Sequence, residues 1–171
     1  MKPATGGVHH LALVCKDAKA THEFYTGIMG MELTCAIHVP PFKPEEAMHL
    51  FYDMGGGNQL AFFWFRDASE SVVGVSHPQS FAHINASGAM HHLAFSVDSE
   101  DELVAFRERV KAKDVKVTPV IDHDFCRSIY FVDPDGMQLE VSYWVRVLNR
   151  RDISDAVLDQ VGIKLAEPAT A

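Results

Sequence analysis

The tetrapeptide His9-His10-Leu11-Ala12 returns 82 residues later (92 minus 10) as His91-His92-Leu93-Ala94. Each copy opens a stretch that reads as a strand, an amphipathic helix and three further strands. A unit that presents a histidine twice at the same place can build a two-histidine metal site across a pseudo-two-fold axis. The repeat therefore predicts two βαβββ modules, and a metalloenzyme is the first functional hypothesis.

The composition restricts the classes of partner. The chain has 171 residues, of which 47% are hydrophobic and 22% are charged, and this suits one well-buried core. The formal net charge of -8 argues against nucleic acid, because affinity for phosphates comes from clustered Lys and Arg. The longest apolar run, Leu60 to Phe65, is far shorter than the roughly 20 residues of a membrane helix. We therefore expect a cytoplasmic protein that binds a small molecule and no membrane.

Strand, helix and turn signals divide the chain into four segments. Residues 7–66 form the first βαβββ module and residues 89–145 the second. Residues 67–88 are predicted to be a linker and active-site loop, and residues 146–171 a C-terminal helix and tail. The expected fold class is α+β, in which the two tandem modules form a curved mixed sheet around a metal site and the helices lie outside.

Two finer predictions concern the second half of the chain. Apolar runs predict strands over 115–120, 128–132 and 137–144, and the turn Asp133-Pro134-Asp135-Gly136 joins the last two. Periodicity predicts a terminal helix over 153–165.

Alternation along the two repeat strands indicates which histidine of each pair faces a ligand. His9 shares its side with bulky residues, and that side should lie under a helix. His10 shares the opposite side with small residues such as Ala12. In the second copy, His92 shares its side with Ala94 in the same way. Small neighbours leave room for a metal and its ligand, so His10 and His92 are the candidate metal ligands.

A third candidate ligand, Glu140, stands among apolar residues in the last predicted strand. Burying an unpaired carboxylate is costly, so this side chain needs a cation or hydrogen-bond donors. With His10 and His92 it completes a two-histidine, one-carboxylate facial triad, which is typical of non-haem Fe(II) sites with open positions for substrate and oxygen. The expected cofactor is Fe(II), with Mn(II) or another divalent metal as the alternative.

These residues resemble the vicinal oxygen chelate superfamily, which includes glyoxalase I, fosfomycin-modifying enzymes, bleomycin-binding proteins and type I extradiol ring-cleaving dioxygenases. The resemblance covers nearly the whole chain and rests on the His-His-Leu-Ala segments, Phe24-Tyr25, Met29-Gly30, Asp133-Pro134-Asp135-Gly136 and Glu140. It implies that the second histidine of each pair and the final glutamate bind the metal. These positions are His10, His92 and Glu140.

Two further residues resemble the extradiol dioxygenases in particular. His77 lies 15 residues before His92 (92 minus 77), at the spacing of that family's catalytic histidine. Tyr130 lies 10 residues before Glu140 (140 minus 130), in a phrase like Ser-x-Tyr-Phe-x-Asp-Pro-x-Gly. The resemblance implies that His77 acts as an acid/base and that Tyr130 hydrogen-bonds a metal-bound substrate oxygen.

Another active-site histidine of that family falls near Ile121, and His123 is predicted to supply its contact through a shifted loop. The implied partners are a small aromatic, catechol-type substrate and O2, and the aromatic walls would come from Phe63, Phe81 and Phe125. We also expect a homodimer or a higher homo-oligomer.

Other function classes of the superfamily stay open. A glyoxalase-like lyase takes a further ligand from the last strand of its first module, where this chain has Ala61. A fosfomycin-resistance-like transferase or epoxide-opening enzyme uses the same ligand types but needs cations for a phosphonate, and Arg127 is the main candidate here. A bleomycin-resistance-like binding protein would have no catalytic metal, and the predicted triad argues against it.

Overall fold

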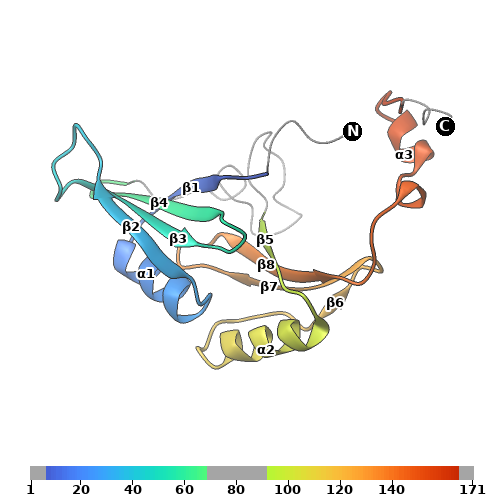
Figure 1. Cartoon of the computed structure of the whole chain (residues 1–171), viewed down its shortest axis with the longest axis horizontal. Coiled ribbons are helices and arrows are strands. Elements are labelled where there is room, and N and C mark those ends of the chain that lie inside the picture. Colours follow the sequence, from blue (N-terminus) through green and yellow to red (C-terminus); the bar gives the residue numbers. More distant parts are fainter. Residues whose placement is uncertain (1–6, 69–91, 166–171) are drawn as a thin grey trace.

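A computed structural model describes residues 7–68 and 92–165 (Figure 1). Two modules of the same strand and helix order follow one another, and each forms its own four-stranded sheet. In Figure 1 the helices α1 and α2 both lie below the strands, so one side of each sheet is covered by a helix. The prediction of an α+β fold with two βαβββ modules and outer helices is confirmed.

The first module has the strand order β1-β4-β3-β2, in which β1 pairs with β4 in parallel and the other pairs are antiparallel. Asp17 begins the helix, because its carboxylate accepts hydrogen bonds from the backbone N–H groups of Lys19 and Ala20. The elements are β1 (His10–Cys15), α1 (Ala18–Gly27), β2 (Glu32–His38), β3 (Ala47–Asp53) and β4 (Gln59–Phe65).

The second module repeats this topology with the order β5-β8-β7-β6. Ser99 caps its helix by accepting a hydrogen bond from the backbone N–H of Glu102. The acidic first turn and basic last turn of α2 also match the helix dipole. The elements are β5 (Leu93–Ser96), α2 (Glu100–Lys111), β6 (Ile121–Asp122), β7 (Cys126–Val132) and β8 (Gln138–Trp144).

One hydrophobic core, shared by both modules, lies between the sheets and the helices. Tyr25 of α1 is fully buried, and its hydroxyl donates to Oδ2 of Asp133, in the turn before β8, at 3.1 Å. The ring centroids of Phe24 and Phe131 lie 6.3 Å apart across the same boundary. These contacts fix the first helix against the second sheet.

The predicted strand over 115–120 is wrong. The structure has only the two-residue β6 just after this segment. Thr118 explains the difference, because its N–H donates to the carbonyl of Tyr130 while its side-chain oxygen accepts from the N–H of Tyr130, both at 3.0 Å. A side chain thus replaces part of the ladder, and Pro119 has no N–H to extend it.

The C-terminal helix is shorter than the predicted 153–165. A 3-10 turn, η2 (Arg150–Asp152), precedes α3 (Asp155–Asp159), and neither contains a buried residue. Gly162 adopts φ +72°, a conformation that ends helices readily in glycine. In Figure 1 this segment stands apart from both sheets. The limits given to the modules and the linker stay a prediction.

Among residues 7–68 and 92–165, no helix is long and apolar enough to cross a membrane.

Candidate metal and substrate site

The side of each sheet that faces away from α1 and α2 is termed the ligand face. On β1, Leu11 and Leu13 pack against the core, whereas His10 and Ala12 are exposed on the other side. The predicted alternation is therefore confirmed for these residues. Residues that lie opposite one another in paired strands point to the same side of the sheet, so the strand register identifies the other residues of each ligand face. The first carries His10, Ala12, His49, Phe51, Ala61 and Phe63, and the second carries His92, Ala94, Ser128, Tyr130, Glu140 and Ser142.

His92 and Glu140 meet on the second ligand face. Nε2 of His92 lies 3.0 Å from Oε2 of Glu140. The parallel pairing of β5 with β8 sets this approach, because Ala94 lies opposite Glu140 and His92 lies two residues earlier on the same face. Glu140 is only 7% exposed, and a carboxylate at that depth requires a partner.

Tyr130 lies beside this pair, directly opposite Glu140 in the pairing of β7 with β8. Burial, and then the negative charge of Glu140, raise the pKa of Tyr130 to about 12. Its ring is edge-on to His92, with centroids 6.1 Å apart. The phenol therefore stays neutral at ordinary pH and keeps a hydrogen to donate.

His123 reaches Tyr130 from the loop between β6 and β7. Its Nε2 lies 3.0 Å from the hydroxyl of Tyr130, and its ring stacks near that of Phe125 with centroids 6.4 Å apart. Four of the six predicted site residues are thus brought into one row on the second ligand face, in the order His123, Tyr130, Glu140 and His92.

His10 occupies the matching place on the first ligand face but has a different partner. Its Nδ1 lies 2.8 Å from Nδ1 of His9, so one of these two nitrogens donates to the other. Strand register explains the difference: Ala12 lies opposite Ala61, as Ala94 lies opposite Glu140. The first sheet has a methyl group where the second has a carboxylate.

Within the described ranges 7–68 and 92–165, no three side chains of His, Cys, Asp or Glu lie together as a metal site. The structure joins His92 to Glu140 and leaves His10 outside that pair. The predicted acid/base His77 and the predicted wall residue Phe81 lie outside the described residues.

Comparison with known proteins shows which family has this fold. The model of the Glyoxalase/Bleomycin resistance protein/Dioxygenase superfamily matches residues 7–141. The chain belongs to this superfamily. The resemblance found in the sequence is therefore confirmed.

Individual relatives within the superfamily differ in what is known of them. "Uncharacterized protein YaeR" of Escherichia coli (strain K12) is 29% identical over 136 residues, which cover 78% of this chain and 93% of YaeR. Biphenyl-2,3-diol 1,2-dioxygenase 2 of Rhodococcus globerulus is 30% identical over 94 residues, which cover 54% of this chain and 48% of the dioxygenase. The match thus spans about half the length of that enzyme.

A solved structure of the superfamily shows the same fold at lower identity. It is a mutant of the fosfomycin resistance protein FosX from Listeria monocytogenes, complexed with Mn(II) and 1S,2S-dihydroxypropylphosphonic acid. The identity is 22% and the TM-score 0.60, and the match covers 87% of this chain and 99% of that chain.

Superfamily members commonly bind divalent metals, and the donors on the second ligand face fit such an ion. Imidazole nitrogen and carboxylate oxygen suit Fe(II) and Mn(II). Within the described part of the chain, Glu140 pairs with His92 and with no Lys or Arg. A buried carboxylate whose neighbours in this part of the chain are an imidazole and a neutral phenol, with no fixed positive charge, is suited to an added cation.

The ligand faces are poor in fixed positive charge. Arg127 is the only Lys or Arg in the eight described strands, and it alternates with Ser128 and so lies on the helix side. There it forms ion pairs with Glu100 and Asp122. Arg127 is therefore not available to bind a phosphonate in this superfamily member.

Sequence analysis missed three polar residues on the ligand faces. The hydroxyl of Ser128 donates to Oγ of Ser142 at 3.0 Å, beyond Tyr130 on the second face. On the first face, His49 lies two residues before Phe51 and shares its side of β3. Strand alternation was the available signal, but it requires knowledge of which strands pair.

Proposed function

We propose that this chain is an Fe(II)-dependent extradiol dioxygenase that cleaves a catechol-type aromatic ring with O2. The row formed by His92, Glu140, Tyr130 and His123 carries the proposal, because it combines metal donors with a neutral phenol and a further imidazole. The similarity to an enzyme named for a biphenyl diol supports the same reaction class.

His92 and Glu140 would hold the metal from the second module, and His10 would complete the set from the first. The contact between Nδ1 of His10 and Nδ1 of His9 leaves Nε2 of His10 to act as a ligand. His9 would then fix the ring orientation, as partners of metal-binding histidines commonly do. When bound, Fe(II) supplies open positions for two adjacent substrate oxygens and for O2, together with the redox capacity that the reaction requires.

Tyr130 would donate its hydroxyl hydrogen to a substrate oxygen next to Glu140. Its raised pKa keeps the donor protonated, and the Nε2–H group of His123 would donate to the hydroxyl oxygen and so hold the phenol in position. His123 also offers a second hydrogen-bonding group at the edge of the same row. These two residues orient the substrate and stabilise the charge on its oxygens.

His77 would move protons between the substrate hydroxyl groups and the products. An imidazole titrates near neutral pH, which suits both accepting a phenolic proton and returning it. This role depends on the family spacing between His77 and His92.

Other reactions of the superfamily have less support. A phosphonate-modifying enzyme needs cations on the ligand face, and Arg127 is engaged on the helix side. A glyoxalase-like lyase needs a ligand where Ala61 stands. In a binding protein without metal, the contacts with His92 and Tyr130 alone would have to offset the cost of burying the Glu140 carboxylate.

Anaerobic reconstitution tests the proposal. The metal-free protein is loaded with Fe(II), or in parallel with Mn(II), and mixed with O2 and a panel of substituted catechols. Oxygen uptake with the appearance of coloured ring-fission product is expected for at least one catechol. Absence of both with either metal across the panel would overturn the proposal.

A size measurement accompanies this assay. We propose a homodimer or higher homo-oligomer, and light scattering on the loaded protein tests it. A single species of monomer mass at assay concentration would contradict this part of the proposal.

A further inference from the structure

His49 is held between two aromatic rings on the first ligand face. It lies opposite Phe63 in the pairing of β3 with β4, and the two rings stack with centroids 3.6 Å apart and planes 14° apart. The ring of Phe51, two residues along β3, lies 4.2 Å away. Phe51 also lies 6.0 Å from the ring of His10. A fixed imidazole thus stands beside the predicted ligand His10, with one aromatic ring between them.

His49 makes no hydrogen bond with the described residues. Its Nε2 is buried and has no partner. An unpaired buried nitrogen lowers stability, and native structures retain few such groups without a reason. Burial, and then the nearby His10, lower the pKa of His49, so the ring is a neutral imidazole with one donor and one acceptor. The chain therefore maintains an unused hydrogen-bonding group on this face.

The strip of the ligand face that runs from His10 to His49 is apolar. Ala12, Ala61 and Phe51 lie at the level between the two histidines, so two methyl groups and one phenyl ring form this part of the face. The ring of Phe51 lies 6.0 Å from that of His10 and 4.2 Å from that of His49, so the two imidazoles are at most 10.2 Å apart (6.0 plus 4.2). That length suits an aromatic ring carrying a substituent.

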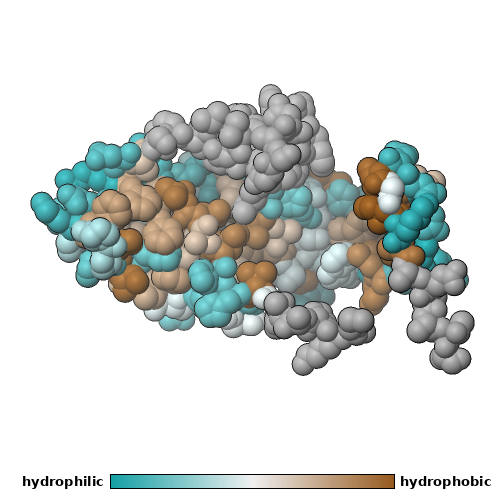
Figure 2. Space-filling view, turned by 90° about the horizontal axis from the view of Figure 1, so that it is seen from above, coloured by the Kyte–Doolittle hydropathy of each residue, from teal (hydrophilic) through white to brown (hydrophobic). Residues whose placement is uncertain are grey.

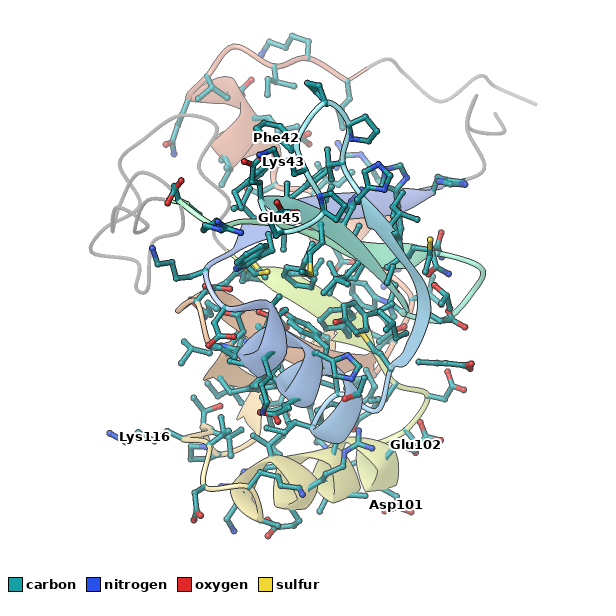
Figure 3. All side chains as sticks on the ribbon, turned by 90° about the vertical axis from the view of Figure 1, so that its left-hand side faces the viewer. Phe42, Lys43, Glu45, Asp101, Glu102 and Lys116 are labelled. Atoms are coloured by element: carbon teal, nitrogen blue, oxygen red, sulfur yellow. The ribbon has the colours of Figure 1, made fainter. Side chains whose placement is uncertain are left out.

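Further aromatic side chains form an apolar wall on the first ligand face, on the side of His49 away from His10. The rings of Phe63 and Phe65 are stacked with centroids 6.0 Å apart, and Phe42 lies 5.6 Å beyond Phe65. Figure 3 shows Phe42 at the opposite end of the molecule from Asp101 and Glu102 of α2. Figure 2 views the molecule from the side opposite the helices and shows apolar side chains gathered across its left half. His49 is thus the polar group within an otherwise apolar wall.

We infer that His49 hydrogen-bonds a polar substituent of the substrate, on the part of the ring remote from the metal. The substrate class is then a catechol that bears a neutral hydroxyl or carbonyl group, rather than a purely hydrocarbon one. This inference rests on the proposed ring-cleaving function, and His49 acts in it as a specificity-determining residue.

Matched substrates test the inference. Methylcatechol and (hydroxymethyl)catechol differ by one oxygen, and each is offered as its 3- and 4-isomer to the Fe(II)-loaded wild type and to His49→Leu and His49→Gln. The wild type should prefer the hydroxymethyl compound in at least one isomer pair. In His49→Leu this preference, measured as the ratio of kcat/KM values, should fall about tenfold, which corresponds to one lost hydrogen bond. His49→Gln should restore part of it.

The possible outcomes separate the two proposals. Oxygen uptake by the wild type with an unchanged ratio in His49→Leu overturns the role of His49 and leaves the dioxygenase intact. A wild type that prefers the methyl compound in both isomer pairs also overturns it. Absence of uptake by the wild type with every catechol overturns both proposals. Because Nε2 has no partner, His49→Leu should melt no lower than the wild type, and a large loss of stability would indicate a structural role instead.

Discussion

The two modules have the same topology, but their ligand faces carry different chemistry. At the level where the second face has Glu140 opposite Tyr130, the first has Ala61 opposite Phe51. One face thus bears a buried carboxylate and a neutral phenol, and the other a methyl group and a phenyl ring. The strand pairing is the same in both modules, whereas the residues at matched positions differ. Under the proposed function, this difference separates metal binding from substrate packing.

The next level of the two faces continues the contrast. Ser128 lies opposite Ser142 on the second sheet, and the matching pair on the first is His49 opposite Phe63. The histidines of the repeat respond to their surroundings, since His92 turns to Glu140 whereas His10 turns to its neighbour His9. The two copies of the repeat thus have different partners, a carboxylate for His92 and an imidazole for His10.

Removing that carboxylate should have the largest effect. Glu140→Gln keeps the size of the side chain but loses its charge, so Fe(II) affinity should fall at least about 100-fold, which exceeds the loss typical of outer-shell partners. Metal content after dialysis and oxygen uptake measure this. Glu32→Gln, on the exposed edge strand β2, is the matched control and should retain both. Stoichiometric iron in Glu140→Gln would contradict the proposal that Glu140 gives the second ligand face its metal affinity.

The reverse change adds a carboxylate to the first face. Ala61 is fully buried, so Ala61→Glu should lower the free energy of unfolding of the metal-free protein by about 3 kcal/mol, through the cost of burying charge. Divalent metal should recover part of this loss, because the new carboxylate lies beside His10. Ala61→Gln has the same size without the charge and should show no recovery. Equal metal responses in the two variants would contradict the proposed matching of Ala61 to Glu140.

Most parts of the fold that depend on local sequence patterns were predicted correctly. Alternation placed Leu11 in the core and His10 on the open face, and the repeat predicted that both modules share one topology. Thr118 shows where this reasoning fails, because its side chain takes a hydrogen bond that a regular strand would form through the backbone. A side chain that substitutes for the ladder leaves no mark on hydrophobic periodicity.

The site was accessible to a smaller extent. The apolar strand around Glu140 indicated this residue, the spacing in the family resemblance indicated Tyr130, and pairing of adjacent strands brings the two together. The turn of His10 toward His9 and the isolation of His49 depend on which residues of β3 and β4 lie opposite them. Strand pairing and register join segments that are far apart in the sequence, so they cannot be predicted from the local pattern of a single sequence.

Making the second face resemble the first should have an intermediate effect. Tyr130→Phe installs the phenyl ring found at Phe51, and the loss of one hydrogen bond to substrate should lower kcat about tenfold while metal content is kept. Because the pKa of Tyr130 is raised to about 12, the wild-type donor should persist until the pH approaches that value. Tyr143→Phe, on the helix side of β8, is the matched control and should leave kcat unchanged. Loss of iron from Tyr130→Phe would assign the phenol to metal binding.

The smallest expected effect concerns the turns that precede the last strand of each module. The first turn has three exposed glycines with positive φ, Gly55, Gly56 and Gly57, whereas Asp133 holds the second. Asp133 accepts from the backbone N–H groups of Asp135 and Met137 and from the hydroxyl of Tyr25. The second turn is thus anchored to α1, whereas the first is held by side chains at its own ends: Asp53 accepts from the N–H of Gly55, and the amide of Asn58 donates to the carbonyl of Gly55.

Tyr25→Phe tests this anchor and should lower the free energy of unfolding by about 1 kcal/mol, the net value typical of an intramolecular hydrogen bond. Burial raises the pKa of Asp133, while the Tyr25 hydroxyl lowers it by favouring the carboxylate. The donor therefore matters most when Asp133 is ionised, so the loss should be largest at pH 7 and should shrink as the pH falls through the pKa of Asp133. Chemical denaturation at several pH values measures this, with Tyr52→Phe as the control, since among residues 7–68 and 92–165 the Tyr52 hydroxyl contacts only the ring nitrogen of His22, at 3.3 Å. An equal loss at every pH would mean that the Tyr25 hydroxyl does not act through the charge of Asp133, and the proposed anchoring of the second turn by that carboxylate would be wrong.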